Sequence, residues 1–264
     1  MASHIELGHA LITMVEPDRE TVAEYNRWYE HDHFLSGVLA GPGAFSGRRF
    51  LATRDLKGRR TPDPSPVARP VDDGSFITLY WIERDQLDAH CRWGFPEAAR
   101  LAGLGRMDPR RHHVSTAYYD LVGSSRRADH GVPVELALHH PYAGVVVVWT
   151  AARDPRGDHA GWAATVLGPR LVVPGSPVAQ VVTFRPTALP EPFPTMPGTI
   201  IDGESVDDVL VHCCFVDADP RVTWPTPLAD LAAVLADDPV ARPLLIAPFI
   251  PTVAGTDAHL DELW

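Results

Sequence analysis

The order of apolar segments along the chain constrains the fold more than any other feature. Residues 5–122 alternate between extended and helical apolar spacing. The order is strand, helix, strand, strand, helix, strand, and the expected strands are 5–16, 45–53, 75–83 and 113–122, with helices over 19–34 and 84–104. This order predicts a β-α-β-β-α-β unit with an antiparallel sheet.

The same order returns in the second half of the chain. Strands are expected at 142–151, 178–184, 209–216 and 244–250, with helices at 158–167 and 228–235. Each half has a Pro-Gly pair before its second strand, 12 to 14 residues after a helix tryptophan, which is Trp28 or Trp162. We interpret the pattern as a diverged internal duplication, with an N-terminal ferredoxin-like repeat at 1–125, a linker at 126–141 and a C-terminal repeat at 142–264.

Two such units predict an α+β architecture. One unit covers a single face of its sheet with helices and leaves the other face open and apolar. Two units can pack their antiparallel sheets together into a pseudo-dimeric α/β barrel with a lined cavity in each half. We expect a small apolar ligand between the sheet and the end of the first helix. The proline-rich segment 55–73 is expected to be an exposed loop.

Composition excludes several classes of function. The 34 acidic residues outnumber the 23 Lys and Arg, so the net charge of −11 disfavours nucleic acid and anionic membrane surfaces as partners. No apolar run approaches the ~20 residues of a membrane span. The beginning of the chain lacks a secretory pattern, so we expect a cytoplasmic protein. The three cysteines form no Cys-x-x-Cys pair and are expected to be buried. Nucleotide-binding glycine motifs are also missing.

The most distinctive string is NRWYEHDHF at 26–34, followed by Gly-Pro-Gly at 41–43 and Arg-Arg-Phe at 48–50. It resembles the dimeric α/β-barrel superfamily, particularly the EthD-like and stress-responsive branches. In those branches an Asn/Asp-x-Trp-Tyr helix end runs into a histidine, and the matching position here is His33. The proline that usually follows the histidine is absent. The second half has no matching histidine, which points to one active cavity in the N-terminal half.

The resemblance implies a cofactor-independent enzyme that acts on a small aromatic or polyketide-like metabolite. Acid–base catalysis by a histidine would make it a lyase, isomerase or cyclase. One alternative is a cofactor-free oxygenase of the same barrel type. Another is a non-catalytic carrier of a hydrophobic metabolite or of haem. A small hydrophobic substrate is the expected partner, no cofactor or metal is expected, and a homodimer is possible.

Three residues are candidates for the catalytic group. His33 is expected at a helix C-terminus, where it would titrate near neutrality and exchange protons. Glu30, three residues earlier, could fix the tautomer of His33, and Asp32 is its acidic neighbour. The alternative role for His33 is to cap the last carbonyls of the helix.

The candidates for substrate binding come from the predicted strands and the same helix. An arginine within an apolar strand needs a partner, so an inward-facing Arg49 could bind a substrate anion or a protein acid, or form a surface ion pair. Alternation places one of two strand aromatics in the cavity. The remaining candidates are a tyrosine of the helix and two histidines, either of which could also join His31 and His33 in a metal site. The full set is Arg49, Tyr29, Tyr80, Trp81, His113 and His9.

Overall fold

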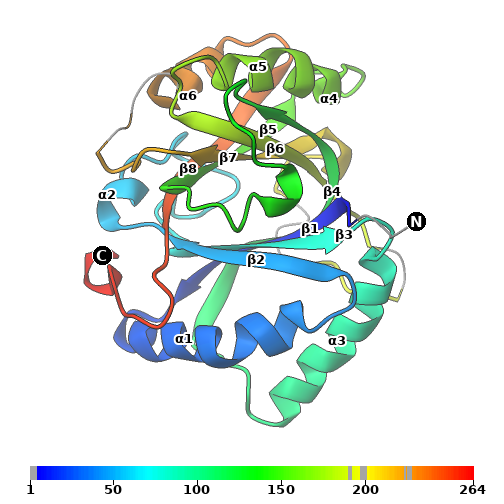
Figure 1. The fold of residues 1–264 in the computed structure, drawn as a ribbon, viewed down its shortest axis with the longest axis vertical. Helices are drawn as coiled ribbons and strands as arrows, with labels where there is room; N and C mark the ends of the chain where they lie inside the picture. The colour runs from blue at the N-terminus through cyan, green and yellow to red at the C-terminus, as the bar shows by residue number, and fades with distance from the viewer. Residues whose placement is uncertain (1–4, 190–191, 197–200, 223, 225–227) are drawn as a thin grey trace.

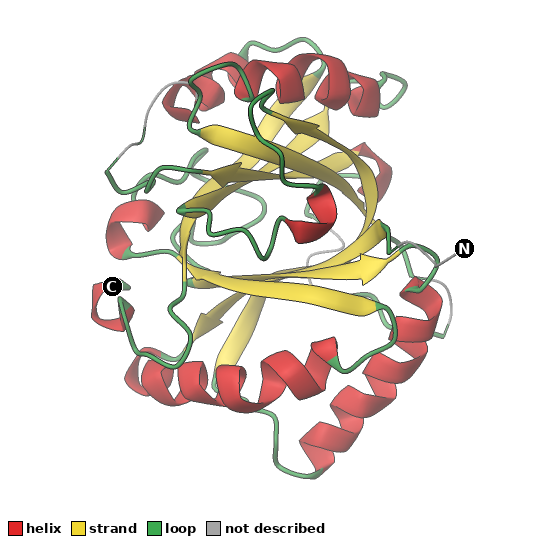
Figure 2. Ribbon diagram, in the orientation of Figure 1, coloured by secondary structure: helices red, strands yellow, loops and turns green. Residues whose placement is uncertain are grey.

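Eight antiparallel strands form one closed barrel, and helices cover it on two opposite sides (Figures 1 and 2). The computed structural model describes residues 5–189, 192–196, 201–222, 224 and 228–264. The strands are β1 Leu7–Pro17, β2 Ala44–Leu51, β3 Phe76–Glu83, β4 Arg111–Arg126, β5 Gly144–Ala152, β6 Val178–Pro186, β7 Val209–Val216 and β8 Ala241–Pro251. None of the described helices is long and apolar enough to cross a membrane.

The helices fall into two groups (Figure 1). Those of the first group lie along one side of the barrel and are α1 Val22–Trp28, the π-helix η2 Tyr29–Leu39 and α3 Leu87–Gly103. Those of the second lie on the opposite side and are α4 His159–Trp162, the π-helix η4 Ala163–Leu167, α5 Gly168–Leu171 and α6 Leu228–Ala236. Short helices also occur in the connections, namely η1 Arg19–Thr21, α2 Arg54–Lys57, η3 Val134–Leu136, η5 Val206–Asp208 and η6 Leu260–Glu262.

The strand order is the same within each half of the barrel. It reads β4-β1-β3-β2 in the first half and β8-β5-β7-β6 in the second. The halves join at two seams of unequal length. Strands β2 and β8 share only two register pairs, whereas β4 pairs with β6 from Tyr119 to Arg126. Strand β4 therefore extends four residues beyond its expected end at Val122.

Side-chain alternation separates an inner layer from two outer layers. In β3, Leu79 and Trp81 pack inside the barrel, while Tyr80 and Ile82 face the helices of the first group. The interior holds a continuous apolar cluster with large aromatic side chains. Side chains therefore fill the space between the two sheets, because an eight-stranded barrel is just wide enough to hold them.

The end of the first helix was predicted wrongly. The first helix does not stop near His33 but continues to Leu39 with a π-helical pattern, closed by a bond from the Ala40 amide to the Leu35 carbonyl at 2.8 Å. The second expected helix, at 84–104, forms as the continuous helix α3, with Pro96 in its interior. Its buried face packs on the sheet, and this packing outweighs the local cost of an interior proline.

The expectation of an exposed loop at 55–73 was also wrong. Thr61 bridges to Ile246 of β8, and Ser65 is buried with its hydroxyl donating to the Leu244 carbonyl at 2.7 Å. The buried guanidinium of Arg60 donates to backbone carbonyls of residues 71, 73 and 74. Hydrogen bonds to its own backbone thus let a polar, proline-rich segment pack against one end of the barrel.

A buried carboxylate anchors that end of the barrel. Glu16 Oε2 accepts the amides of Gly74 and Ser75 at 2.8 and 2.6 Å. Glu16 Oε1 accepts the Ser75 hydroxyl at 2.8 Å and the indole N–H of Trp264 at 3.0 Å. Lys57 Nζ lies 3.7 Å from Oε2. One side chain at the end of β1 thereby holds the segment before β3 and the last residue of the chain.

We predict that Glu16→Gln lowers the free energy of unfolding by about 2–4 kcal/mol, because the new amide group faces donors that then lack an acceptor. Urea unfolding followed by tryptophan fluorescence measures the change. The control is Glu6→Gln, which removes an exposed ion pair with Arg84 and should cost less than about 1 kcal/mol. Equal losses in the two variants would contradict the anchoring role.

Candidate functional site

A pocket of about 280 Å³ lies between the outer sheet face of the first half and the helices η2 and α3. We call it the His33 pocket. Its position agrees with the expected site between the sheet and the first helix. Most of its lining is apolar or aromatic, and its residues are Leu11, Thr13, Val15, Tyr29, His33, Gly37, Val38, Tyr80, Gly94, Phe95, Ala98, Met107, Arg111, His113, Thr116, Tyr118 and Met196.

The imidazole of His33 is held by ring contacts within its own helix. It stacks on Trp28 with ring centroids 4.8 Å apart, and it meets the edge of Tyr29 at 5.1 Å. A glycine makes room for it, since a Cβ on Gly37 would lie 2.5 Å from Nδ1 of His33. Nδ1 is buried without a hydrogen-bond partner among the described residues, whereas Nε2 is not buried. His33 therefore presents Nε2 to the pocket.

The acid–base properties of His33 differ from those expected. Burial, followed by the positive charges of Arg111 and His113, lowers its pKa from 6.5 to about 4. The expectation of titration near neutrality at a helix C-terminus was wrong, because the helix continues for six residues past His33 and the ring is largely removed from water. At neutral pH the ring is uncharged.

Arg111 is a candidate site residue that was not predicted from the sequence. It begins β4, lines the His33 pocket and places its guanidinium 4.8 Å from the centroid of the Trp28 ring. Its guanidinium forms no hydrogen bond or ion pair with the residues that the structure describes, whereas its neighbour Arg110 pairs with Asp108 and Glu24. The Arg110–Arg111 pair at the start of a strand was the available signal. The pocket thus contains one cation without an anionic partner.

Two pairs of hydroxyl groups also line the pocket, one pair of threonines and one pair of tyrosines. The hydroxyls of Thr13 and Thr116 lie 2.7 Å apart across β1 and β4, and Thr116 Oγ1 lies 2.7 Å from Nδ1 of His113. The phenol oxygens of Tyr29 and Tyr80 lie 2.8 Å apart. Tyr29, Tyr80 and His113 are therefore in the pocket as predicted, whereas the two threonines were missed.

The predicted catalytic carboxylates have other partners. Glu30 accepts a hydrogen bond from Arg49 at 3.3 Å and from the Gly255 amide at 2.8 Å, so it does not orient His33. Asp32 binds Arg106 through both oxygens, and this ion pair lowers the pKa of Asp32 to about 2. Neither carboxylate lines the His33 pocket. Both instead hold neighbouring segments against the helix.

Arg49 is buried but does not line the pocket. Its guanidinium donates to Asn26 at 2.9 Å and to Glu30, and it lies 4.2 Å from the centroid of the Tyr29 ring. Of the partners considered for an inward arginine, the structure shows a protein acid. Arg49 therefore supports Tyr29 from behind, and the prediction of direct substrate binding was wrong.

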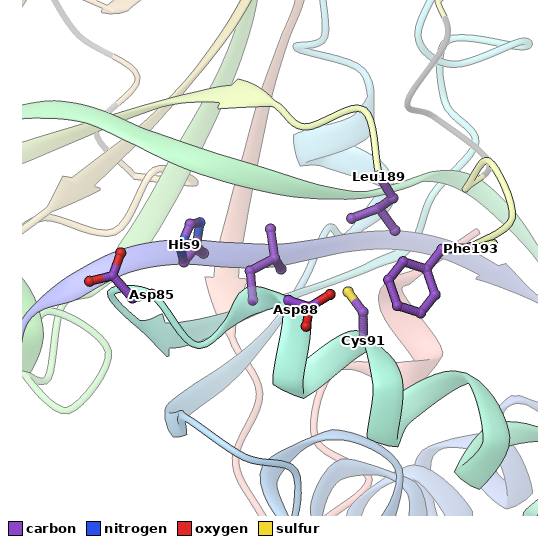
Figure 3. Close-up of a pocket in the computed structure, with 7 residues that line it drawn as sticks. His9, Asp85, Asp88, Cys91, Leu189 and Phe193 are labelled. Carbon is purple, nitrogen blue, oxygen red and sulfur yellow. The ribbon is translucent and has the colours of Figure 1, made fainter. Parts of the chain in front are cut away.

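Trp81 and His9 lie elsewhere. Trp81 packs inside the barrel, with its ring centroid 5.3 Å from that of Phe184. Because neighbouring side chains of a strand point to opposite faces, only Tyr80 of the two lines the pocket. His9 pairs with Asp120 at 2.7 Å. It lines a second pocket of about 330 Å³ beside the start of α3, where Cys91 and Phe193 also lie (Figure 3). Its role in the His33 pocket is therefore excluded.

The pocket offers little to a metal or to haem. Among the described residues no group of three or more histidine, cysteine or acidic side chains could hold a metal ion. A volume of about 280 Å³ is at the lower end for small-molecule sites and does not fit a haem macrocycle. The donors that do converge on the pocket, from Arg111 and His33, suit a ligand oxygen.

We predict that Gly37→Ala displaces the His33 ring and raises its pKa from about 4 toward 6.5, because the added methyl group would lie only 2.5 Å from Nδ1 and pushes the ring into water. A proton NMR titration of the imidazole measures the pKa. Gly94→Ala is the control within the same pocket, since its Cβ would make only an ordinary contact of 3.8 Å with Tyr118. An unchanged His33 pKa in the Gly37 variant would contradict this geometry.

Comparisons with known proteins give similarity of fold. No family model matches the chain, and no curated protein matches its sequence. An anthrone oxidase-like protein has 11% identity over 95% of each chain, with a TM-score of 0.53. A putative chlorite dismutase has 10% identity over 98% of this chain and 100% of that one, with a TM-score of 0.50. A dye-decolorizing peroxidase from Bacteroides thetaiotaomicron has 10% identity over 98% and 96%, with a TM-score of 0.46. The chain therefore shares its overall α+β barrel fold with the first two of these structures.

Proposed function

We propose that the protein is an enzyme that binds a small aromatic molecule as an oxygen anion in the His33 pocket and promotes its reaction with O₂ without a bound cofactor. The observation that carries this proposal is Arg111, a cation without an ionic partner among the described residues, inside a mostly apolar pocket. A partly desolvated charge of this kind favours a ligand that supplies the opposite charge.

The neutral histidine supports the same ligand chemistry. A buried N–H without an acceptor costs more than a buried lone pair, so the proton of neutral His33 belongs on Nε2, the nitrogen that is open to the pocket. In this tautomer His33 donates a hydrogen bond. Together with Arg111 it would stabilise a phenolate or enolate oxygen and so lower the pKa of the bound substrate. His33 then acts as a donor to the substrate rather than as its base.

Size and lining indicate the substrate class. A cavity of about 280 Å³ holds a molecule of two or three fused rings. Phe95 and Tyr118 meet edge to face with centroids 6.5 Å apart and give the pocket flat aromatic walls. Met107 and Met196 line it as well and can adapt to different ring outlines. These surfaces suit an aromatic phenol or ketone.

The proposed reaction with O₂ begins from a substrate anion that is bound in the apolar pocket. Loss of a proton from an activated carbon gives a carbanion that delocalises onto the oxygen beside Arg111. This carbanion can transfer electrons to O₂. For a ring methylene that becomes a ketone, one oxygen atom stays on carbon and the other leaves with the two hydrogens as water. Lyase, isomerase or cyclase chemistry would need the same anion but no O₂. The similarity to an anthrone oxidase-like fold supports the oxidative alternative.

The proposed architecture is a fused pair of ferredoxin-like units, at 1–125 and 142–264, joined by 126–141. Equal strand order in the two halves supports this. In both halves a tryptophan, Trp28 or Trp162, directly precedes a π-helix. Gly43 and Gly175 have positive φ angles of 70° and 79°, so each half turns into its second strand through a left-handed glycine. A homodimer of such fused chains stays a prediction, and its test is the mass in solution.

We predict that 4-nitrophenol bound in the pocket ionises about one pH unit below free 4-nitrophenol, because Arg111 and His33 stabilise its anion by ~1.4 kcal/mol. Absorbance of the yellow anion during a pH titration measures the shift. Arg111→Met should abolish it. Arg110→Met is the matched control, because this neighbour is paired with Asp108 outside the pocket. An unshifted or raised pKa in the wild type would overturn the anion site.

We predict that the enzyme accelerates O₂ uptake by anthrone and incorporates one labelled oxygen atom from ¹⁸O₂. An oxygen electrode and mass spectrometry of the product provide the measurements. His33→Phe and Arg111→Met should each lower kcat/KM by about 100-fold, since each removes a donor to the developing anion. Turnover that proceeds equally well without O₂ would instead identify a lyase or isomerase.

A further inference from the structure

A chain of hydroxyl groups leads out of the His33 pocket. Thr13 and Thr116 face each other in register on β1 and β4, and both side chains are buried. Their oxygens lie 2.7 Å apart, and the Thr116 oxygen lies 2.7 Å from Nδ1 of His113. His113 is exposed and lies at the edge of the pocket. These three side chains therefore form a hydrogen-bonded path from the buried part of the pocket to solvent.

At any moment, all donors along this hydrogen-bonded path point the same way, either toward His113 or toward Thr13. In one arrangement Thr13 donates to Thr116, and Thr116 donates to Nδ1 of His113, whose proton is then on Nε2. In the opposite arrangement Nδ1–H donates to Thr116, and Thr116 donates to Thr13. A threonine hydroxyl both donates and accepts, so it can receive a proton on one side and release its own on the other.

The other groups of the pocket are poor acceptors for a substrate proton. Protonated His33 would bury a second N–H without an acceptor at Nδ1. Glu30 and Asp32 are bound to arginines outside the pocket. His113 is the remaining base with solvent access. The groups around it are Arg111, His112 and His33, and partial desolvation with the charge of Arg111 lowers its pKa to about 4, so it passes a proton on rather than storing it.

We infer that Thr13 and Thr116 relay the substrate proton from the pocket to His113. The inference rests on the proposed function. The substrate O–H or C–H bond breaks, and its proton joins Thr13 Oγ1 while the electron pair stays on the substrate. Thr13 passes its own proton to Thr116, and Thr116 passes its proton to Nδ1 of His113. His113 then releases the Nε2 proton to water. One proton leaves, and rotation of the hydroxyls with tautomer exchange in water restores the chain.

The test uses 2-naphthol as a two-ring phenol that becomes a strong acid in its excited state. Naphthol and naphtholate emit at different wavelengths, so their emission ratio reports proton transfer from the bound molecule without any turnover. In the wild-type protein we expect naphtholate emission. Thr116→Val keeps the shape of the side chain without its hydroxyl and should lower the ratio about tenfold or more. Thr116→Ser keeps the hydroxyl and should restore the ratio.

The outcomes separate the relay from the proposed function. Fluorescence titration gives the affinity for 2-naphthol, which Thr116→Val should change by less than about twofold, because Thr116 moves the proton rather than binding the ring. Wild-type levels of naphtholate emission from a Thr116→Val protein that binds naphthol would overturn the relay. Failure of the wild type to bind naphthol would count against the proposed function itself. Thr13→Val offers a second variant at the other end of the chain, with the same expected loss.

Discussion

Closure of the barrel around its own side chains determines where everything else can lie. Each sheet buries one apolar face inside, and the interior is filled by aromatic groups such as Trp81, Trp149 and Phe215. A filled interior leaves no room for a ligand between the sheets. The His33 pocket lies instead between an outer sheet face and its covering helices, where a π-helix with Gly37 lets the His33 ring lie close to the backbone.

The helix–sheet layers of the two halves differ in whether their buried polar groups have hydrogen-bond partners. In the second half, His212 is fully buried between the hydroxyls of Thr150 and Thr183, each 3.0 Å from one ring nitrogen, and burial lowers its pKa to about 3. Every polar atom of that ring is satisfied, so it stabilises packing in its neutral form. In the first half, Nδ1 of His33 has no hydrogen-bond partner and the side chain of Arg111 forms no ion pair among the described residues. A ligand that pairs with such unsatisfied groups gains the most binding free energy.

Strand positions could be predicted from the sequence because alternation and apolar runs are local signals. The expected strand at 209–216 matches β7, and the others differ by a few residues at their ends. Helix ends were harder to predict. The π-helical continuation past His33 depends on packing against β3 and α3, which local spacing does not report. The segment 55–73 was misassigned for the same reason, since its bonds to β8 and within itself join residues far apart in the chain.

Residue type and spacing along the chain were enough to predict the order of the elements, an antiparallel barrel and the burial of the cysteines. Those features follow from residue type and spacing, which act over a few residues. Only the tertiary structure decided that Glu30, Asp32 and Arg49 stabilise neighbouring segments while Arg111, Thr13 and Thr116 face the pocket. The physical reason is that a charged group takes the nearest opposite charge in space, and closure of the barrel sets which charges are near.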